Sequence, residues 1–342
     1  MDRLLQILSD GEYHSGEELG QLLGISRTAI WKQMQKVESL GLPVDSQKGC
    51  GYRISGGLDL LFHDDVHGQL SQKAKGLLKK LEIESTVAST NELAKQRAET
   101  ENASGLVVLA EQQTQGRGRR GRQWVSPYGC NLYLSLVWGF DGGVSVLEGL
   151  SLAVGVAVQK AVARIGGQSL ELKWPNDLLW QQRKIGGILL EVIGDPAGFC
   201  QVIIGIGLNV DMPKNHAAGI DQGWANLVEM IQCNEIQNPQ SQRAVSRNTV
   251  LRNIVPRNKL AGVVIDELLQ LLENYHELGF KHYRDEWLQH DAYADKVVTL
   301  SMMDKAVEGI ARGVNHAGAL QLEIDGEIRV FSGGEVSLRG IK

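Results

Sequence analysis

The sequence lacks paired cysteines, long apolar runs and a strong excess of charge, and each absence removes a class of protein. Its four cysteines are scattered, and no two of them have the C-x-x-C spacing. They are Cys50, Cys130, Cys200 and Cys233. This distribution argues against a zinc site and against a disulfide framework. A reducing cytoplasm is therefore the predicted compartment.

No apolar span approaches the length of about eighteen residues that could cross a membrane, and the apolar run at the amino terminus is too short for a signal peptide. We therefore expect no contact with a membrane. The net charge of -5 gives no overall attraction to nucleic acid, so any DNA contact has to come from a local basic patch. With 342 residues and 43% hydrophobic content, the chain is long enough for two or three domains and a large core.

The sequence does contain a loop rich in arginine and glycine. Residues 116–122 read Gly-Arg-Gly-Arg-Arg-Gly-Arg, and the flanking segments 107–110 and 131–137 have the pattern of strands. Glycine lets the backbone approach a ligand closely, and arginine presents two donors at once to a phosphate or carboxylate. The stretch also fits G-x-G-x-x-G, but a dinucleotide site needs a helix after it and none is predicted. An anion-binding loop is favoured over the alternative, a flexible segment that contacts RNA.

Residues 1 to about 60 predict three short helices and a hairpin. Ser15 with Glu18 forms a capping box, and Ser26 can cap the third helix. The segment from Gly16 to Gln35 is predicted to be a helix-turn-helix, and residues 48–54 predict the tip and return strand of a small wing. The pattern is typical of a winged helix.

Basic residues gather on the predicted recognition helix and wing. Up to residue 60 there are six Lys and Arg against eight Asp and Glu, but between Ser26 and Arg53 there are five basic and two acidic residues. The residues predicted to contact DNA are Ser26, Arg27, Thr28, Trp31, Lys32, Lys36, Lys48 and Arg53. The alternative is a module that docks a protein, because the helix-turn-helix shape also occurs without DNA.

From about residue 64 strands alternate with helices. Residues 150–165 predict a buried helix, 171–174 a strand, 175–178 a tight turn, and 183–192 and 202–210 two apolar strands. The second of these strands contains glycines where another group has to come close. The mostly polar residues 232–248 predict a mobile insertion, and a helix resumes at 264–275. After residue 287, short strands with glycine turns indicate a small barrel.

Several polar or aromatic residues of this region have two interpretations. Ser89, Thr90 and Asn91 stand at a predicted helix start, where Ser89 or Thr90 can cap the helix, the commoner use of such residues. The alternative is that the three side chains hold a ligand. Lys184 opens an apolar strand beside two glycines and is either solvated or a phosphate contact. Trp224 follows a polar loop and is interpreted first as a core residue, with a platform for a base as the alternative.

Taken in order, these motifs resemble the bifunctional biotin-protein ligases that also repress a biotin operon. The resemblance covers almost the whole chain, and the Arg-Gly loop and the Lys-Trp-Pro-Asn-Asp block are specific in combination. The polar segment near 232–256 is longer than the family leads us to expect. The matching segments are the winged helix and residues 89–91, 116–122, 173–177, 183–187, 207–209, 222–224 and 333–337.

The resemblance implies roles for particular residues. Ser89, Thr90, Asn91 and Gln113 would hydrogen-bond the biotin head group, whose buried ureido atoms all need partners. Arg117, Gly118 and Arg119 would enclose the phosphate and the acyl group, and Lys184 would stabilise the charge that develops between them. Asp177 would favour Mg2+ or the incoming lysine, Asn209 would line the pocket, and Trp224 would cover the adenine.

The resemblance also implies the architecture and the partners. It predicts an α+β multidomain protein: a winged helix at 1–63, a catalytic domain at 64–287 with a mixed sheet like that of class II synthetases, and an SH3-like barrel at 288–342. The implied substrates are biotin and MgATP, and the implied partners are a biotin carboxyl carrier domain, operator DNA and a second copy in a ligand-promoted dimer. Residues 187–193 are a candidate edge for that dimer. A lipoate-protein ligase and a non-catalytic sensor of biotinyl-adenylate stay open as alternatives.

Overall fold

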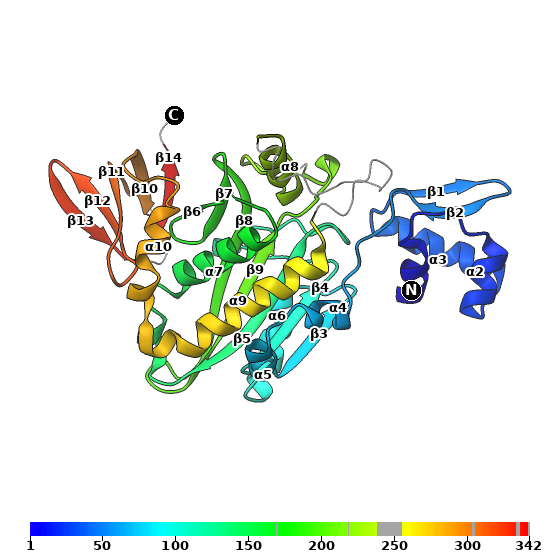
Figure 1. The fold of residues 1–342 in the computed structure, drawn as a ribbon, viewed down its shortest axis with the longest axis horizontal. Coiled ribbons are helices and arrows are strands. Elements are labelled where there is room, and N and C mark those ends of the chain that lie inside the picture. Colours follow the sequence, from blue (N-terminus) through cyan, green and yellow to red (C-terminus); the bar gives the residue numbers. More distant parts are fainter. Residues whose placement is uncertain (169, 218, 238–254, 303–304, 333–335, 341–342) are drawn as a thin grey trace.

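The computed structural model describes residues 1–168, 170–217, 219–237, 255–302, 305–332 and 336–340. They form an elongated molecule with a winged helix at one end, a large mixed sheet in the middle and a smaller sheet at the other end (Figure 1). Part of the expected polar insertion, residues 238–254, lies outside this description, and so do residues 333–335 of the last expected motif. The first six residues of that insertion belong to helix α8, Leu227–Gln237.

The amino-terminal module has the predicted three helices and hairpin. Ser15 and Glu18 form both bonds of the capping box, and Ser26 accepts a hydrogen bond from the backbone of Ala29. Its core is a separate hydrophobic cluster that includes Leu5 and Ile30. The elements are α1 (Asp2–Leu8), α2 (Gly16–Leu23), α3 (Arg27–Ser39), β1 (Val44–Gln47) and β2 (Gly51–Ile54).

The central sheet has seven strands in the order β3-β4-β5-β9-β8-β7-β6. Only β3 and β4 pair in parallel, so the sheet is mixed, as predicted. The strands are β3 (Lys80–Glu84), β4 (Leu106–Ala110), β5 (Leu132–Phe140), β6 (Glu171–Lys173), β7 (Asp177–Trp180), β8 (Arg183–Gly194) and β9 (Cys200–Leu208). The Arg-Gly loop joins β4 to β5, strand to strand, and contains one short 3-10 turn, η1 (Arg119–Gly121).

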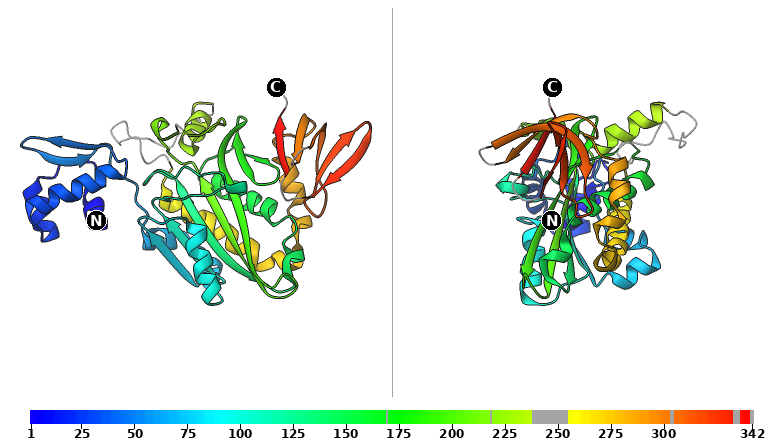
Figure 2. Two further views of the ribbon diagram at one scale, coloured as in Figure 1. Left: turned by 180° about the vertical axis from the view of Figure 1, so that it is seen from behind. Right: turned by 90° about the vertical axis from the view of Figure 1, so that its left-hand side faces the viewer.

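Helices cover both faces of this sheet (Figure 2). Helices α7 (Leu150–Arg164) and α9 (Arg257–Leu278) pack on one face, and α6 (Thr90–Thr100) packs on the other. The remaining elements of this region are α4 (His63–Gly68), α5 (Gln72–Leu77), η2 (Gly143–Leu147), η3 (Lys214–Ala217), η6 (Phe280–His282) and α10 (Arg284–Gln289).

The expectation that no apolar span approaches eighteen residues is wrong. Residues Gly143–Arg164 form one helical stretch of 22 residues that is long and apolar enough to cross a membrane by length and composition alone. However, 61% of its most apolar window is buried within the protein. Its apolar surface is therefore used by the sheet and by α9, as the predicted buried helix requires.

The carboxy-terminal strands form a five-stranded antiparallel sheet in the order β13-β12-β11-β10-β14. Within the described residues β13 and β14 pair only with their inner neighbours, so closure into a barrel stays a prediction. The buried side chains of this sheet join the same cluster as the central core. The strands are β10 (Val297–Met302), β11 (Lys305–Val314), β12 (Leu320–Ile324), β13 (Glu327–Phe331) and β14 (Val336–Gly340).

Candidate active site

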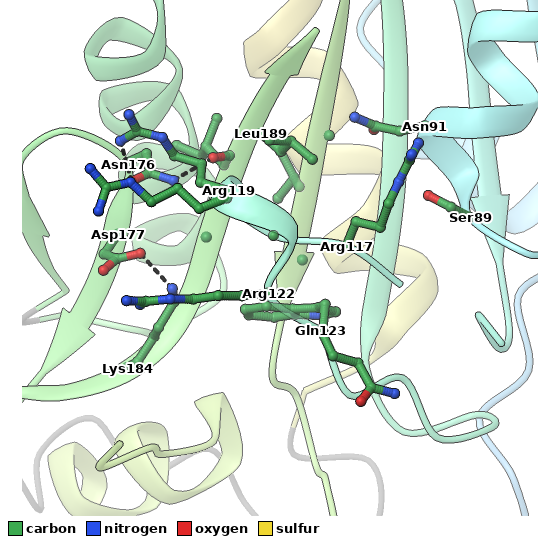
Figure 3. A pocket seen from close by; sticks show the side chains of 18 of the residues that line it. Ser89, Asn91, Arg117, Arg119, Arg122, Gln123, Asn176, Asp177, Lys184 and Leu189 are labelled. Carbon is green, nitrogen blue, oxygen red and sulfur yellow. Dashed lines mark hydrogen bonds and ion pairs between the residues drawn. The ribbon is translucent and has the colours of Figure 1, made fainter. Parts of the chain in front are cut away.

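A central cavity lies between the Arg-Gly loop and strands β8 and β9, where the predicted site residues meet. It brings together Ser89, Thr90, Asn91, Gln113, Arg117, Gly118, Arg119, Asp177 and Lys184. Figure 3 shows Ser89, Asn91 and Arg117 at one end of the cavity, and Arg119, Asn176, Asp177 and Lys184 at the other. The two ends differ in charge. We call the first, where Arg117 is paired with Glu92 and Glu191, the neutral end, and the second the cationic end.

The neutral end is built around a buried hydroxyl on strand β5. The Ser135 hydroxyl lies 2.8 Å from the Thr90 hydroxyl and 2.6 Å from the Asn91 side-chain oxygen. The side-chain oxygen of Gln113 accepts hydrogen bonds from the Thr90 backbone at 2.9 Å and from the Thr90 hydroxyl at 3.2 Å. Ser89, Thr90, Asn91 and Ser135 are all buried, so the network is held in one arrangement.

Helix capping does not explain these polar residues. Ser89 is the N-cap residue of α6, yet its side chain makes no capping hydrogen bond. The Gln113 side chain instead bonds to the first backbone N–H of the helix, that of Thr90. The capping interpretation of Ser89 is therefore wrong, and the Ser89 hydroxyl remains beside the cavity that it lines.

Two glycines on β9 make room for the side chains that enter the site. A Cβ atom at Gly205 would overlap the Asn91 side chain, and one at Gly207 would lie 2.5 Å from the indole ring of Trp124. The sequence predicted that something comes close to this strand, and these two side chains are the groups in question. Any larger residue at either position would displace them.

The cationic end has one carboxylate between two ammonium groups. Lys184 Nζ lies 2.5 Å from one oxygen of Asp177, and Lys173 Nζ lies 3.0 Å from the other. Burial would raise the pKa of Asp177, but the two lysines outweigh burial and lower it. Arg119 donates from Nη1 to the Asn176 side-chain oxygen at 3.3 Å. Burial, together with the neighbouring Arg120, lowers the pKa of the Arg119 guanidinium, while Asp177 acts in the opposite direction.

The loop itself is folded back as a short hairpin. Gly118 donates to the Arg122 carbonyl at 2.7 Å, and Trp124 donates to the Gly116 carbonyl at 2.9 Å. Arg117 does not point to the cationic end, because its guanidinium pairs with Glu92 at 3.0 Å. The loop therefore divides its arginines between the two ends of the cavity.

A second cavity adjoins the central one, shares Trp124 with it, and is lined by Asn209 and Trp224. Trp224 is half-buried and lines this cavity, so the core interpretation is wrong and the platform interpretation is favoured. The Asn209 side chain donates to the Lys184 carbonyl at 3.4 Å and to the Ala225 carbonyl at 3.3 Å. Asn209 therefore ties together the neighbouring backbone segments at Lys184 and Ala225, which are themselves hydrogen-bonded at 3.0 Å.

Sequence reasoning missed three residues of the site. Trp124 lines both cavities, and its ring centre lies 5.6 Å from Lys184 Nζ. Tyr293, from the linker after α10, forms part of the wall of the second cavity. Ser135 lies in a strand that reads as apolar. The only signal for Trp124 was its position directly after the charged loop.

The residues present do not form a protein-held magnesium site. Among the described residues no group of three or more His, Cys, Asp or Glu side chains could hold a metal ion. Both oxygens of Asp177 are engaged by lysines. The expected role of Asp177 as a Mg2+ ligand is therefore not supported.

The predicted DNA-contacting residues lie on α3 and on the wing. Seven of the eight are exposed: Ser26, Arg27, Thr28, Trp31, Lys32, Lys36 and Lys48. Arg53 is different, because it pairs with Asp45 at 3.0 Å and lies over the ring of Tyr13 at 4.4 Å. Arg53 therefore stabilises the wing through these two contacts, and its guanidinium is less available to a DNA phosphate than the exposed basic side chains are.

Known families match the chain in three consecutive parts. A helix-turn-helix domain matches residues 1–53, the biotin/lipoate A/B protein ligase family matches residues 83–209, and a biotin protein ligase C-terminal domain matches residues 295–339. The chain is 37% identical over 336 residues to the bifunctional ligase/repressor BirA of Salmonella typhimurium, which covers 98% of this chain and 96% of that protein.

A second relative and a solved structure agree with this match. The chain is 31% identical over 263 residues to the biotin--[acetyl-CoA-carboxylase] ligase of Mycobacterium tuberculosis, covering 75% of this chain and 88% of that protein. Its structure resembles the biotin protein ligase of Aquifex aeolicus solved with biotin and ATP, with a TM-score of 0.59 and 26% identity. That likeness covers 77% of this chain and 100% of the other.

Proposed function

The chain belongs to the bifunctional ligase/repressor family of biotin protein ligases, and from this premise we propose how its residues carry out the two reactions. The protein is an ATP-dependent biotin-protein ligase that forms biotinyl-5'-AMP and transfers biotin to a lysine of a carboxyl carrier domain. The observation that supports this assignment best is the meeting, in one cavity, of a fixed neutral hydrogen-bonding end and a cationic end.

In the first step, a carboxylate oxygen of biotin attacks the α-phosphorus of ATP. An O–P bond forms, and the bond to the bridging oxygen breaks, so that pyrophosphate leaves with the electron pair. Ser89, Thr90, Asn91 and Gln113 bind the biotin head group at the neutral end, where an unmatched head group would leave buried polar atoms unpaired. This fixed position places the carboxylate for in-line attack.

The cationic end stabilises the charge of the first step. Arg119 and Lys184 bind the phosphate and the acyl oxygen, and Gly118 allows the loop backbone to approach them. Arg117 completes the enclosure when the loop closes over the acyl-phosphate. Trp224 covers the adenine, and Asn209 holds the backbone that lines the nucleotide pocket.

In the second step, the lysine amine of the carrier attacks the acyl carbon. A C–N bond forms, the C–O bond to AMP breaks, and AMP leaves with the electron pair. The lysine ammonium loses one proton before the attack, and the new amide nitrogen loses another after it. Asp177 attracts the incoming ammonium electrostatically; its lowered pKa makes it a weak proton acceptor.

The winged helix makes the protein a transcriptional repressor of biotin biosynthesis, with biotinyl-5'-AMP as the corepressor. The exposed basic residues of α3 and the wing contact the operator. A single module with a small basic patch binds weakly, whereas a twofold dimer presents two recognition helices at once. Dimerisation is therefore the proposed switch.

The dimer is proposed to form along strand β8. Pairing with β7 ends at Gly187, whereas β8 continues to Gly194, so residues 189–194 have no neighbouring strand on that side within the described part of the chain. Val192 on this segment is 43% exposed. Glu191 from the same segment accepts a hydrogen bond from Asn91 at 2.7 Å, so ligand binding at the neutral end acts directly on the pairing edge.

Finer structural points also belong to this proposal. We divide the chain into a winged helix at 1–63, a catalytic domain at 64–287 and a carboxy-terminal domain at 288–342. The sheet of the catalytic domain is proposed to be of the class II synthetase type, and the carboxy-terminal sheet to be an SH3-like barrel. The reducing cytoplasm is the proposed compartment, in keeping with the absence of C-x-x-C spacing.

One assay tests the activity. The protein is incubated with ATP and either biotin or lipoate, with and without an acceptor carrier domain, and label transfer and pyrophosphate release are followed. We expect pyrophosphate release and label transfer to the carrier domain with biotin, and neither with lipoate. Transfer of lipoate would identify a lipoate-protein ligase, and binding of biotinyl-adenylate without transfer would identify a sensor.

A further inference from the structure

One tryptophan of the chain lies on the surface of the predicted recognition helix. Trp31, in the second turn of α3, is 50% exposed. The structure describes the other six tryptophans as well, and each of them is buried or half-buried. The core of the winged helix is built by other residues, among them Leu19 and Ile30, and does not include Trp31. The fold of the module therefore does not account for this side chain.

The exposed side chains of α3 recur with the period of a helix and share one face. Ile30, Met34 and Val37 are turned to the core, so the face that remains is open to solvent. Up to Lys36 every charged side chain of this face is basic, and Trp31 is its one large apolar side chain. The exposed positions are Arg27, Thr28, Trp31, Lys32, Gln35, Lys36, Glu38 and Ser39.

The basic neighbours of Trp31 indicate what covers it. An exposed tryptophan also occurs on surfaces that bind proteins, but here Arg27 and Lys32 stand on the same face and favour a polyanion. The first turns of a recognition helix lie against base edges in the major groove. The one apolar group that base edges present there is the C5 methyl group of thymine. A large apolar side chain at this position therefore matches thymine.

We propose that Trp31 is a specificity-determining residue of the repressor, and that its indole ring packs against the C5 methyl group of a thymine in the operator. This inference rests on the proposed function, because it assigns a base contact to the DNA-binding module. Phosphate contacts from Arg27, Lys32 and Lys36 would supply affinity for any sequence, whereas Trp31 distinguishes thymine from the other bases. Burial of one methyl group corresponds to about a fourfold difference in affinity.

The first experiment removes the methyl group and the tryptophan separately and together. The full-length protein, with biotin and MgATP, selects duplexes from a random-sequence pool, and each thymine of the selected duplex is then replaced by deoxyuridine, which lacks only the methyl group. In each half-site we expect one replacement to weaken wild-type binding about fourfold and to have no effect on Trp31→Ala. Equal effects on both proteins at every thymine would overturn the proposal. If wild type selects no duplex, the proposed repressor function itself fails.

Two control variants separate this contact from other losses. Leu22, on α2 of the same module, is 45% exposed, and Leu22→Ala should keep the wild-type response to deoxyuridine. Lys36→Ala should weaken all duplexes alike and lower the slope of log Kd against log salt by about one, whereas Trp31→Ala should leave that slope unchanged. A fall in slope for Trp31→Ala equal to that for Lys36→Ala would contradict an apolar contact. Because Trp31 lies outside the core, its variant should melt at the wild-type temperature.

The second experiment uses the fluorescence of Trp31 itself. Because the other six tryptophans are buried or half-buried, Trp31 should give the emission that acrylamide quenches most readily, and Trp31→Phe should remove this component. Addition of the selected duplex should protect it from acrylamide in the wild-type protein. Equal quenching with and without the duplex would overturn the proposal. Protection by a carrier domain but not by the duplex would also overturn it and would identify a protein-docking face.

Discussion

The two ends of the central cavity are held together by different kinds of interaction. At the neutral end, Ser135, Thr90 and Asn91 bond to one another in a buried network, and Asn91 also donates to the Glu191 carboxylate at 2.7 Å. At the cationic end, Asp177 balances Lys173 and Lys184, with Arg119 beside them. A network of neutral groups that is already in place binds most tightly a ligand whose shape and hydrogen-bonding groups match it. A cluster with excess positive charge instead stabilises the negative charge that develops in the transition state.

This difference predicts that the two ends separate in kinetic measurements. Changes at the neutral end should weaken biotin binding, and changes at the cationic end should slow adenylate formation or release its product. Four predictions test the separation.

Lys184→Ala is expected to have the largest effect. Loss of the ammonium removes an interaction made mainly in the transition state, so adenylate formation should slow on the order of a hundredfold while the biotin Kd stays near wild type. Pyrophosphate exchange measures the rate of adenylate formation, and calorimetry measures the biotin Kd. Exchange near the wild-type rate would show that Lys184 does not stabilise the transition state. A large rise in the biotin Kd would show that the cationic end also contributes to biotin binding.

Arg119→Gly should let biotinyl-adenylate escape. The bound anion loses a charge-assisted pair of hydrogen bonds of about 2 kcal/mol, which corresponds to a dissociation rate roughly 30-fold faster. Arg120→Gly is the matched control, because Arg120 is exposed and has a φ of 58°, which glycine adopts without strain. If both variants release the adenylate at the same rate, Arg119 is not its main partner.

Ser135→Ala tests the neutral end. It removes one hydroxyl and leaves two buried groups, on Thr90 and Asn91, without that partner. We expect biotin affinity to fall about tenfold, a loss of about 1.4 kcal/mol, with little change in the KM for ATP. Ser151→Ala, where the hydroxyl bonds to the Pro175 carbonyl outside this network, is the control. A parallel rise of the ATP KM in Ser135→Ala would show that the ends are coupled.

The smallest expected effect is on the pH dependence of pyrophosphate exchange, to which we expect Asp177 to contribute no titration. The two lysines outweigh burial and lower its folded-state pKa, so the carboxylate stays ionised as the pH falls through the usual range of an aspartate. The stability that it contributes is present above the unfolded pKa and is lost only as the pH falls through the lowered folded pKa. Asp177→Asn should therefore leave the shape of the exchange profile unchanged between about pH 6 and 8, although the rate falls. An acid limb present in wild type and absent in the variant would show that Asp177 titrates in this range.

The sequence predicted local elements well where one residue type decides the local conformation. The capping box at Ser15, the strand-to-strand loop at 116–122 and the glycines of β9 follow from backbone geometry that neighbouring residues determine. The predicted site residues, Asp177 included, also come together around the central cavity and the cavity beside it. The interpretation of Trp224 as a core residue was wrong.

The residues that were missed depend on contacts between distant segments. Ser135 is one polar residue in an apolar strand, and only its pairing with Gly205 on β9 puts it beside Asn91. Trp124 is one of seven tryptophans, and only the lack of a side chain at Gly207 leaves room for its ring beside the two cavities that it lines. Tyr293 reaches the site because the linker after α10 bonds to Leu172, through a donor–acceptor pair with Ala292 at 2.9 Å. Register and long-range docking of this kind are absent from a local pattern.

The arrangement of the hydrophobic cores determines which parts of the chain could be removed to make a shorter biotin-labelling enzyme. The winged helix has its own core, so a tool cut from this chain could begin after it, provided that Tyr128 is made polar, because that side chain inserts into the departing core. The carboxy-terminal sheet cannot be removed in the same way. Its apolar residues complete the central core, and its turn carries the carbonyl that orients Trp174. A minimal reagent would therefore be trimmed from the amino terminus alone, and it would label proteins without reading DNA.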